Sequence, residues 1–89
     1  MADDPELAVL TARFDPMPGS EQPLMGILAE YVVVTRQVAE CRNIDLLASA
    51  SLPGRLLLVE KWESPGAARA HLDSPEMAEM AAAAVGHLA

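Results

Sequence analysis

Apolar and polar residues alternate at the start of the sequence. The run LAVLTARF covers residues 7–14 and places every second side chain on the same side of an extended chain. This period of two predicts a β-strand. One face would carry Val9, Thr11 and Arg13, and the other Leu10, Ala12 and Phe14. The turn-forming residues of DPMPGS, residues 15–20, predict the end of the strand.

A longer period follows and predicts a helix over residues 21–40. Ser20 precedes it as an expected N-cap, and Pro23 falls in the first turn, where a missing N–H costs nothing. The triplet 32–34 is all valine and favours a strand, but the helical spacing extends over more residues. The expected apolar stripe contains Leu24, Ile27, Leu28, Tyr31, Val34 and Val38.

Two further apolar runs predict a pair of antiparallel strands. NIDLLASA, residues 43–50, and RLLLVEKW, residues 55–62, are joined by SLPG, whose Pro53 and Gly54 fit a turn. From Leu56 to Val59 both faces of the second run are apolar, which indicates that both sides of the sheet are covered. The helices can cover one side, so we expect a second copy of the chain, in a homodimer, to cover the other.

Two Ser-Pro pairs predict the remaining helices. Ser64 and Ser74 would be N-caps, with Pro65 and Pro75 at the first helical positions. The first helix would cover residues 65–72, and the second would carry a stripe of Met77, Met80, Ala81, Ala84 and Leu88. The order strand, helix, strand, strand, helix, helix predicts one α+β domain over residues 1–89, with residues 1–6 as a flexible arm. It matches a ferredoxin-like pattern of an antiparallel sheet with helices on one face, without the last strand.

The composition and charge exclude some classes of binding partner. Thirteen acidic residues against six basic ones give a formal net charge of −7, with no basic cluster, so neither nucleic acid nor an anionic membrane surface is an expected partner. The longest apolar run is too short to span a membrane. A lone cysteine, Cys41, forms no internal disulfide and suits the cytoplasm. His71 and His87 lie sixteen positions apart and lack the spacing of a metal site.

The region of the Ser-Pro pairs carries a resemblance to a known family. Glu60-x-Trp62 ends a strand, Ser64-Pro65 opens a short helix, His71 lies near its end, and Ser74-Pro75 opens another helix. Weaker matches are Ala12–Phe14 and Cys41–Leu47, so the match extends over nearly the whole chain. In these features the sequence resembles the antibiotic biosynthesis monooxygenase family of small dimeric α+β barrels.

The resemblance implies both a scaffold and an activity. It implies a cavity between sheet and helices in each protomer, two sheets packed face to face, and oxidation of a small aromatic phenol or quinol by dioxygen without a metal, flavin or other cofactor. Trp62 and His71 would be the catalytic residues, and Tyr31, Arg13 and Phe14 would bind the substrate. Relatives that degrade haem need an Asn and a His where this chain has Ala12 and Ala81, which argues against that reaction.

Each of these residues also has a structural interpretation. Trp62 would anchor the edge of the core, Tyr31 would be a core residue with a wet hydroxyl, and His71 would bind the last carbonyls of its helix. Glu60 would form a salt bridge across the dimer, and Cys41 would pack as a small hydrophobe. The function alternative is a non-catalytic dimeric module, which either holds a small hydrophobic ligand or has a filled cavity.

The end of the sequence departs from the family pattern. The family continues into a fourth strand, whereas this sequence stops at Ala89. Residues 85–89 would form a short substitute, or the polypeptide is cut short, or the dimer covers the sheet edge in another way.

Overall fold

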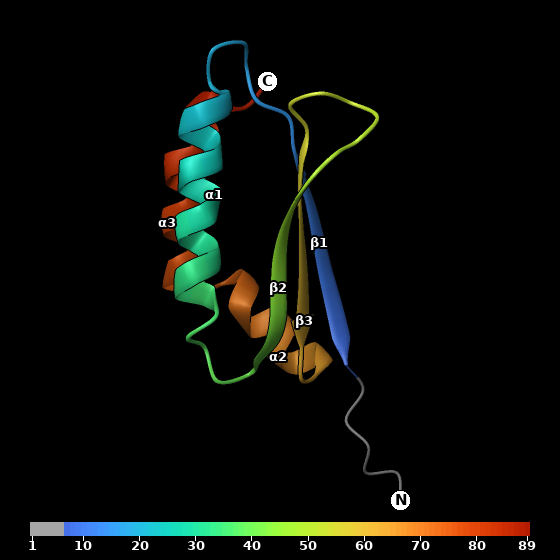
Figure 1. Ribbon diagram of the computed structural model, residues 1–89. Helices are drawn as coiled ribbons and strands as arrows, with labels where there is room; N and C mark the ends of the chain where they lie inside the picture. Colours follow the sequence, from blue (N-terminus) through green and yellow to red (C-terminus); the bar gives the residue numbers. More distant parts are fainter. Residues whose placement is uncertain (1–6) are drawn as a thin grey trace, which may run out of the picture.

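Three strands form one antiparallel sheet. The computed structural model describes residues 7–89 and places strands at β1 (Ala8–Phe14), β2 (Cys41–Ala48) and β3 (Leu56–Trp62) (Figure 1). The order in the sheet is β1-β3-β2, so β3 is central, and both neighbouring pairs are antiparallel. The predicted arm over residues 1–6 lies outside the described part.

The helices α1 (Glu21–Thr35), α2 (Pro65–Leu72) and α3 (Pro75–Ala84) follow the predicted order, and a short 3₁₀ helix covers Val85–His87. Figure 1 shows α1 and α3 on one side of the sheet, with α2 near the end of β3. The predicted ferredoxin-like α+β fold is confirmed. None of the helices within residues 7–89 is long and apolar enough to cross a membrane.

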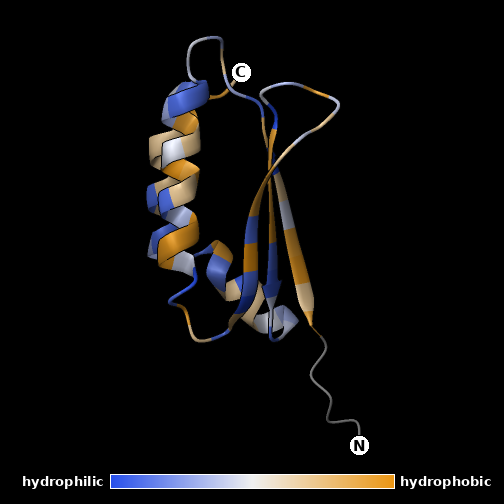
Figure 2. Cartoon of the chain, viewed as in Figure 1, coloured by the Kyte–Doolittle hydropathy of each residue, from blue (hydrophilic) through white to orange (hydrophobic). Residues whose placement is uncertain are grey.

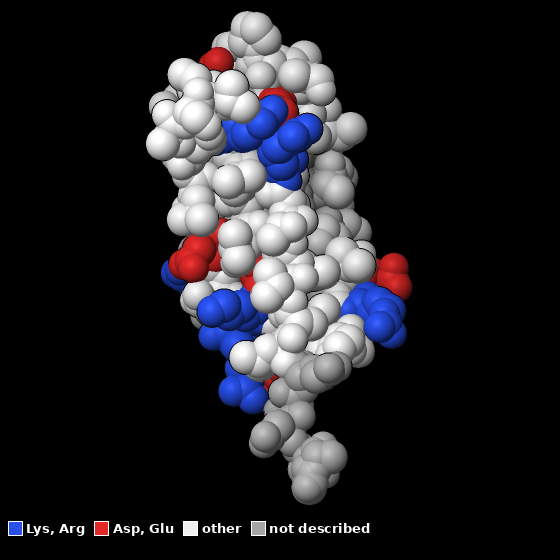
Figure 3. Space-filling model, turned by 90° about the vertical axis from the view of Figure 1, so that its right-hand side faces the viewer, with Lys and Arg blue, Asp and Glu red and all other residues white. Residues whose placement is uncertain are grey.

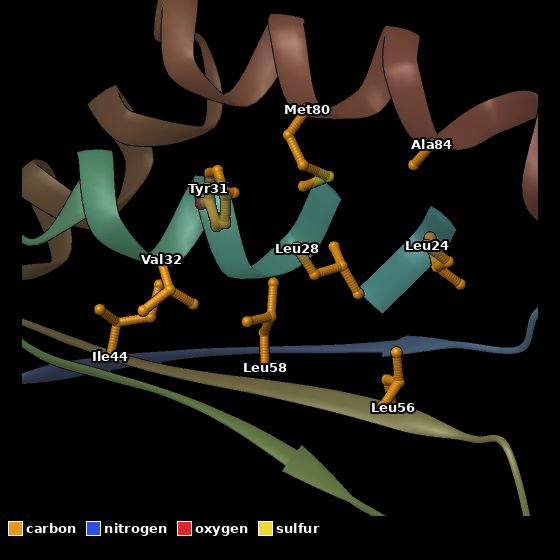
Figure 4. Close-up of a cluster of buried hydrophobic side chains, with 9 residues drawn as sticks. All are labelled: Leu24, Leu28, Tyr31, Val32, Ile44, Leu56, Leu58, Met80 and Ala84. Carbon is orange, nitrogen blue, oxygen red and sulfur yellow. The ribbon is translucent and has the colours of Figure 1, made fainter. Parts of the chain in front are cut away.

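The main core lies between α1 and the sheet. Aliphatic side chains of α1 meet those of β2 and β3, and α3 closes the far side of α1 (Figure 4). The cluster consists of Leu24, Leu28, Tyr31, Val32, Ile44, Leu56, Leu58, Met80 and Ala84. These side chains are buried between α1 and the middle of the sheet.

The helix predicted over residues 21–40 ends at Thr35. The backbone N–H of Gln37 donates to Val34 and that of Val38 to Thr35, and these short-range bonds tighten the chain into a turn before β2. The buried stripe also differs from the predicted one, because Val32 and Thr35 are buried while Val34 is exposed. Thr35 contributes the buried side-chain oxygen that, within residues 7–89, has no hydrogen-bond partner.

The three predicted N-caps had different outcomes. Ser64 and Ser74 accept hydrogen bonds from the backbone amides of Ala67 and Met77, as predicted. Ser20 precedes α1, but its side chain makes no cap bond and instead lies 3.0 Å from Nδ1 of His87. That contact spans 67 positions, so local sequence could not reveal it.

The hairpin connecting β2 and β3 contains the predicted turn. Gly54 has a φ of 88°, a left-handed conformation that favours glycine. The amide of Ser49 donates to the carbonyl of Arg55, which closes the loop. β2 begins at Cys41 rather than at Asn43 and contains an irregularity between these two residues.

The last residues pair with the chain just after β1. Leu88 forms an isolated antiparallel bridge with Pro16, and the amide of Ala89 donates to the carbonyl of Asp15 at 2.8 Å. Residues 85–89 therefore form a 3₁₀ turn followed by a short pairing with the segment after β1.

Within residues 7–89, no helix lies over the outer face of the sheet. Its middle is formed by side chains that alternate with those of the core. Figure 3 shows a band of uncharged residues across this middle, with charged residues above it and toward both sides. The apolar members are Val9, Leu47, Leu57 and Val59. Figure 2 shows the corresponding pattern along the chain, with hydrophobic residues interrupted by hydrophilic ones in the strands.

Candidate functional site

Four side chains with polar groups meet at the end of the core where β3 faces α2. β3 contributes Glu60 and Trp62, which lie two positions apart and therefore share the inner face of the strand. α1 contributes Tyr31, and α2 contributes His71. Their exposed fractions are between 1% and 4%, so the cluster is shielded from water.

A hydrogen-bonded chain connects these residues. The hydroxyl of Tyr31 donates to Oε2 of Glu60 at 2.8 Å and also lies 2.8 Å from Nε2 of His71. The indole N–H of Trp62 donates to Oε1 of Glu60 at 3.0 Å. Both carboxylate oxygens therefore have a donor, as a buried carboxylate requires.

Ring packing fixes the position of the imidazole. The ring centroids of His71 and Trp62 lie 4.4 Å apart with an interplanar angle of 32°. The ring centroid of Tyr31 lies 5.8 Å from that of His71. His71 thus packs near two aromatic side chains, and its Nε2 atom is 4.0 Å from Oε1 of Glu60.

The environment holds the phenol of Tyr31 in its neutral form. Burial raises the pKa of Tyr31 far above its ordinary value of 10.0, and the carboxylate of Glu60 raises that pKa further. At neutral pH Tyr31 can therefore donate a proton, or pass one on, but it does not act as a standing phenolate base.

The structure brings three of the five predicted site residues together and separates the other two. Trp62, His71 and Tyr31 belong to the cluster. Phe14 lies on the inner face of the sheet but pairs with Leu56, at the opposite end of β3 from Trp62. Leu56 and Trp62 are six residues apart along β3, and this separation corresponds to roughly 20 Å of strand.

Arg13 is separated from the cluster by the sheet itself, because its side chain lies on the outer face. It is exposed, and its guanidinium approaches Asp15 at 3.6 Å. Arg13 and Phe14 are consecutive residues of a strand, so their side chains leave opposite faces and cannot line one pocket in this protomer. The cluster at Tyr31 and His71 excludes both.

Several structural interpretations of single residues are also settled by these positions. Glu60 was expected to form a salt bridge across a dimer, but it faces inward and accepts hydrogen bonds from its own chain. His71 was weighed as a helix cap, but its ring is buried against Trp62. The hydroxyl of Tyr31 is buried rather than wet. The signal for Glu60 was present in the sequence, because it alternates with Leu58 and Trp62 on the inner face.

Cys41 lies near this end of the sheet as a free thiol. Burial and the nearby carboxylate of Glu60 raise the pKa of that thiol above its ordinary value, which lowers its thiolate fraction. This fits the interpretation of Cys41 as a small hydrophobe. Within residues 7–89, no group of three or more His, Cys, Asp or Glu side chains is arranged to hold a metal ion.

Two hollows border the cluster. One, of about 320 Å³, is lined by Trp62, His71 and Ser74 together with Ala67, Ala70 and Val38. The other, of about 380 Å³, lies between α1 and α3 beside Tyr31, Ile27 and Met80. Glu76, at the start of α3, borders both hollows. These volumes are at the small end of the range for ligand pockets.

Comparison with known proteins identifies the family. The family model described as antibiotic biosynthesis monooxygenase matches residues 8–83. The chain belongs to the antibiotic biosynthesis monooxygenase family. The resemblance seen at Glu60–Trp62 and at the Ser-Pro pairs is thereby confirmed. The match covers all three strands, α2 and all of α3 except its last residue, and includes every residue of the cluster.

Solved structures of similar proteins share the whole fold. Rv0793 from Mycobacterium tuberculosis is 31% identical, with a TM-score of 0.84 over 93% of this chain and 84% of the other. A conserved protein from Methanosarcina mazei Go1 is 20% identical, with a TM-score of 0.82 over 92% of this chain and 80% of the other. A crystal structure named antibiotic biosynthesis monooxygenase is 23% identical, with a TM-score of 0.81 over 93% of this chain and 86% of the other. No curated protein sequence matches the chain.

Proposed function

We propose that the protein is a cofactor-independent monooxygenase that oxidises a small phenol or quinol with dioxygen. One observation carries this proposal: a buried carboxylate, phenol and imidazole form one hydrogen-bonded chain through Glu60, Tyr31 and His71. A chain of this kind can take up a proton in a water-poor environment. The adjoining hollows provide room for an aromatic ring next to it.

The proposed reaction needs only a substrate and dioxygen. A phenol with a hydrogen at its para carbon reacts with O₂ to give a para-quinone and water. The substrate loses its phenolic proton, and the electron-rich ring then transfers electrons to oxygen and forms a carbon–oxygen bond at the para carbon. Cleavage of the O–O bond leaves one oxygen atom in the quinone. The other oxygen departs as water with the ring hydrogen and the phenolic proton.

The cluster would assist the first of these steps. Because the pKa of Tyr31 is raised, this residue would not remove a proton by itself at neutral pH. Instead its oxygen would accept the substrate's proton while its own proton moves to Glu60, 2.8 Å away. His71 would hold the phenol oxygen in place from the other side. Trp62 would fix Glu60 through its indole N–H and form a wall of the neighbouring hollow.

This assignment differs from the sequence prediction in the role of Trp62. Trp62 was predicted as a catalytic residue, but its indole N–H already donates to Glu60. The proposed proton acceptor is therefore Glu60, with Trp62 and His71 in supporting positions.

We also propose that the working unit is a homodimer in the cytoplasm. The outer face of the sheet exposes Val9 and Leu47 beside the half-buried Leu57 and Val59, and no element within residues 7–89 covers it. Apolar sheet faces of this kind are commonly covered by another protein surface. The free thiol of Cys41 suits a reducing compartment.

Oxygen consumption tests the catalytic proposal. The purified protein is mixed with a panel of phenols and hydroquinones, and uptake is compared with that of Glu60→Gln, which keeps the shape but removes the carboxylate. We expect the rate to fall by about 100-fold, since a positioned acid or base contributes on the order of 10² to 10⁴. Glu63→Gln is the matched control and should retain the rate. Equal, slow oxygen uptake by the wild type, Glu60→Gln and buffer would identify a ligand-binding module instead.

A further inference from the structure

The two Ser-Pro caps are alike in their backbone contacts and differ in one respect. Ser64 accepts from the amide of Ala67 at 3.1 Å, and Ser74 accepts from the amide of Met77 at 3.2 Å. Each serine is followed by a proline at the start of its helix. Only Ser74 has a second contact, because its hydroxyl oxygen also lies 3.4 Å from Nδ1 of His71. This distance is at the long end for a hydrogen bond.

The positions of the protons follow from the contacts of Tyr31. Its hydroxyl has a single proton, which is donated to Glu60. The 2.8 Å contact between the Tyr31 oxygen and Nε2 of His71 must then be a bond in which Nε2–H donates. A neutral imidazole with a proton on Nε2 has a bare Nδ1 that accepts.

Ser74 is the group placed to donate to that bare nitrogen. One lone pair of its oxygen accepts the amide proton of Met77, which leaves the O–H free to point toward Nδ1 of His71. The donors then run in one direction, from Ser74 to His71, from His71 to Tyr31, and from Tyr31 to Glu60. Every donor in this chain has an acceptor, and no proton is assigned twice.

We propose that Ser74 is a positioning residue that holds His71 in the Nε2–H tautomer and thereby directs the hydroxyl proton of Tyr31 toward Glu60. The residue that caps α3 would therefore also set the direction of the hydrogen bonds in the buried cluster. The expected effect on oxygen uptake rests on the proposed monooxygenase function, whereas the tautomer of His71 does not depend on that function. The tautomer assignment and the monooxygenase function can therefore be refuted separately.

Nitrogen NMR of the histidine side chains tests the tautomer directly. In the wild type we expect His71 to show a protonated Nε2 and a bare Nδ1 that accepts a hydrogen bond. In Ser74→Ala the Nδ1 signal should move, because that nitrogen loses its donor. In Ser74→Asp the carboxylate can still cap Met77 but can only accept from His71, so Nδ1 should become protonated. A wild-type His71 with its proton on Nδ1 would overturn the proposal.

Ser64 provides a matched control for the loss of a helix cap. Ser64→Ala and Ser64→Asp change the same type of cap on α2, next to the same type of proline, and should leave the His71 tautomer unchanged. Ser74→Thr keeps both the cap and the O–H and should restore the wild-type spectrum. Identical His71 signals in the wild type, Ser74→Ala and Ser64→Ala would contradict the assigned role even if all variants fold.

Activity gives a second measurement. If the protein oxidises a phenol as proposed, Ser74→Ala should lower the rate by about 3- to 10-fold relative to Ser64→Ala, the effect of one hydrogen bond on the barrier. Ser74→Thr should recover most of that loss. If Ser74→Ala and Ser64→Ala reduce the rate equally, the loss reflects only the removal of a helix cap. That result would contradict the positioning role of Ser74.

Discussion

The phenol oxygen of Tyr31 lies 2.8 Å from Oε2 of Glu60, although the two residues are 29 positions apart. This contact joins α1 to the central strand at a point where both are buried. A contact between two aliphatic side chains would allow α1 to shift along the sheet with little change in energy. A buried hydrogen bond to a carboxylate, in contrast, has one favourable geometry. The pair therefore fixes how α1 sits on the sheet as well as forming the centre of the candidate site.

Removing the hydroxyl of Tyr31 should destabilise the fold. Tyr31→Phe leaves Oε2 of Glu60 and Nε2 of His71 without their shared partner, and an unpaired buried polar group costs about 1 to 3 kcal/mol. Urea unfolding of Tyr31→Phe, Glu60→Gln and the double variant would measure the coupling between the two side chains. We expect the double variant to lose less than the sum of the single losses. Strict additivity would mean that the two groups do not interact in solution.

The phenol of Tyr31 should resist ionisation in the folded protein. Burial and Glu60 raise its pKa above the ordinary 10.0, so the folded state keeps the proton at pH values where the unfolded state loses it. The stability from this group is fully present below about pH 10 and is lost as the pH rises above it. Alkaline absorbance titration is specific here, because Tyr31 is the single tyrosine.

The titration has an internal reference. In denaturant the phenolate signal should appear near pH 10, and without denaturant it should appear only together with alkaline unfolding, followed by circular dichroism. A reversible phenolate signal near pH 10 in the folded protein would show that Tyr31 is not shielded as described.

A surface ion pair gives an independent pH prediction. Arg55 donates two hydrogen bonds to the carboxylate of Asp15, at 2.7 and 3.0 Å, and these bonds lower the pKa of Asp15 below its ordinary 3.8. The stabilisation is present above about pH 4 and disappears as the pH falls below the lowered value. In Arg55→Ala the pKa of Asp15 should rise toward 3.8, as measured by carboxyl NMR. Arg69→Ala, on α2, should leave it unchanged.

The outer sheet face should govern oligomeric state. Val59 lies at its centre, opposite Thr11 on one side and Asp45 on the other. Val59→Lys would place a charge in an apolar interface while remaining compatible with Asp45 within the monomer. We expect sedimentation to show a dimer for the wild type and a monomer for Val59→Lys at micromolar concentration. Leu72→Lys alters an exposed leucine on α2 and should stay dimeric. A wild-type monomer would refute the proposed dimer.

The strands and the short helices could be predicted because their signals are local. The alternation of side chains between two faces predicted β1 and β3. A serine followed by a proline predicted the starts of α2 and α3. The end of α1 could not be predicted in this way. It depends on a turn toward β2, where the side chain of Arg36 donates to the carbonyl of Ile44. Such a contact forms only once the strand is in place.

The candidate site was predictable in part for the same reason. Trp62 and His71 stood out by residue type, but nothing local shows that Tyr31 from α1 lies between His71 and Glu60. Arg13 and Phe14 lie apart from these residues, and the alternation of side chains in β1 places the two on opposite faces of the sheet. The types of these residues suggested which chemistry they could perform. Only the geometry of the strands shows which of their side chains come together.

The packing of Trp62 on His71 has a practical consequence. Trp62 is the single tryptophan of the chain, so all tryptophan fluorescence of the protein originates at the candidate site. Its indole borders the hollow that also contacts His71 and Ser74. A molecule entering that hollow would change the emission without any attached label. The protein thus provides its own optical probe, and screening for molecules that bind in this hollow requires only a fluorimeter and a compound library.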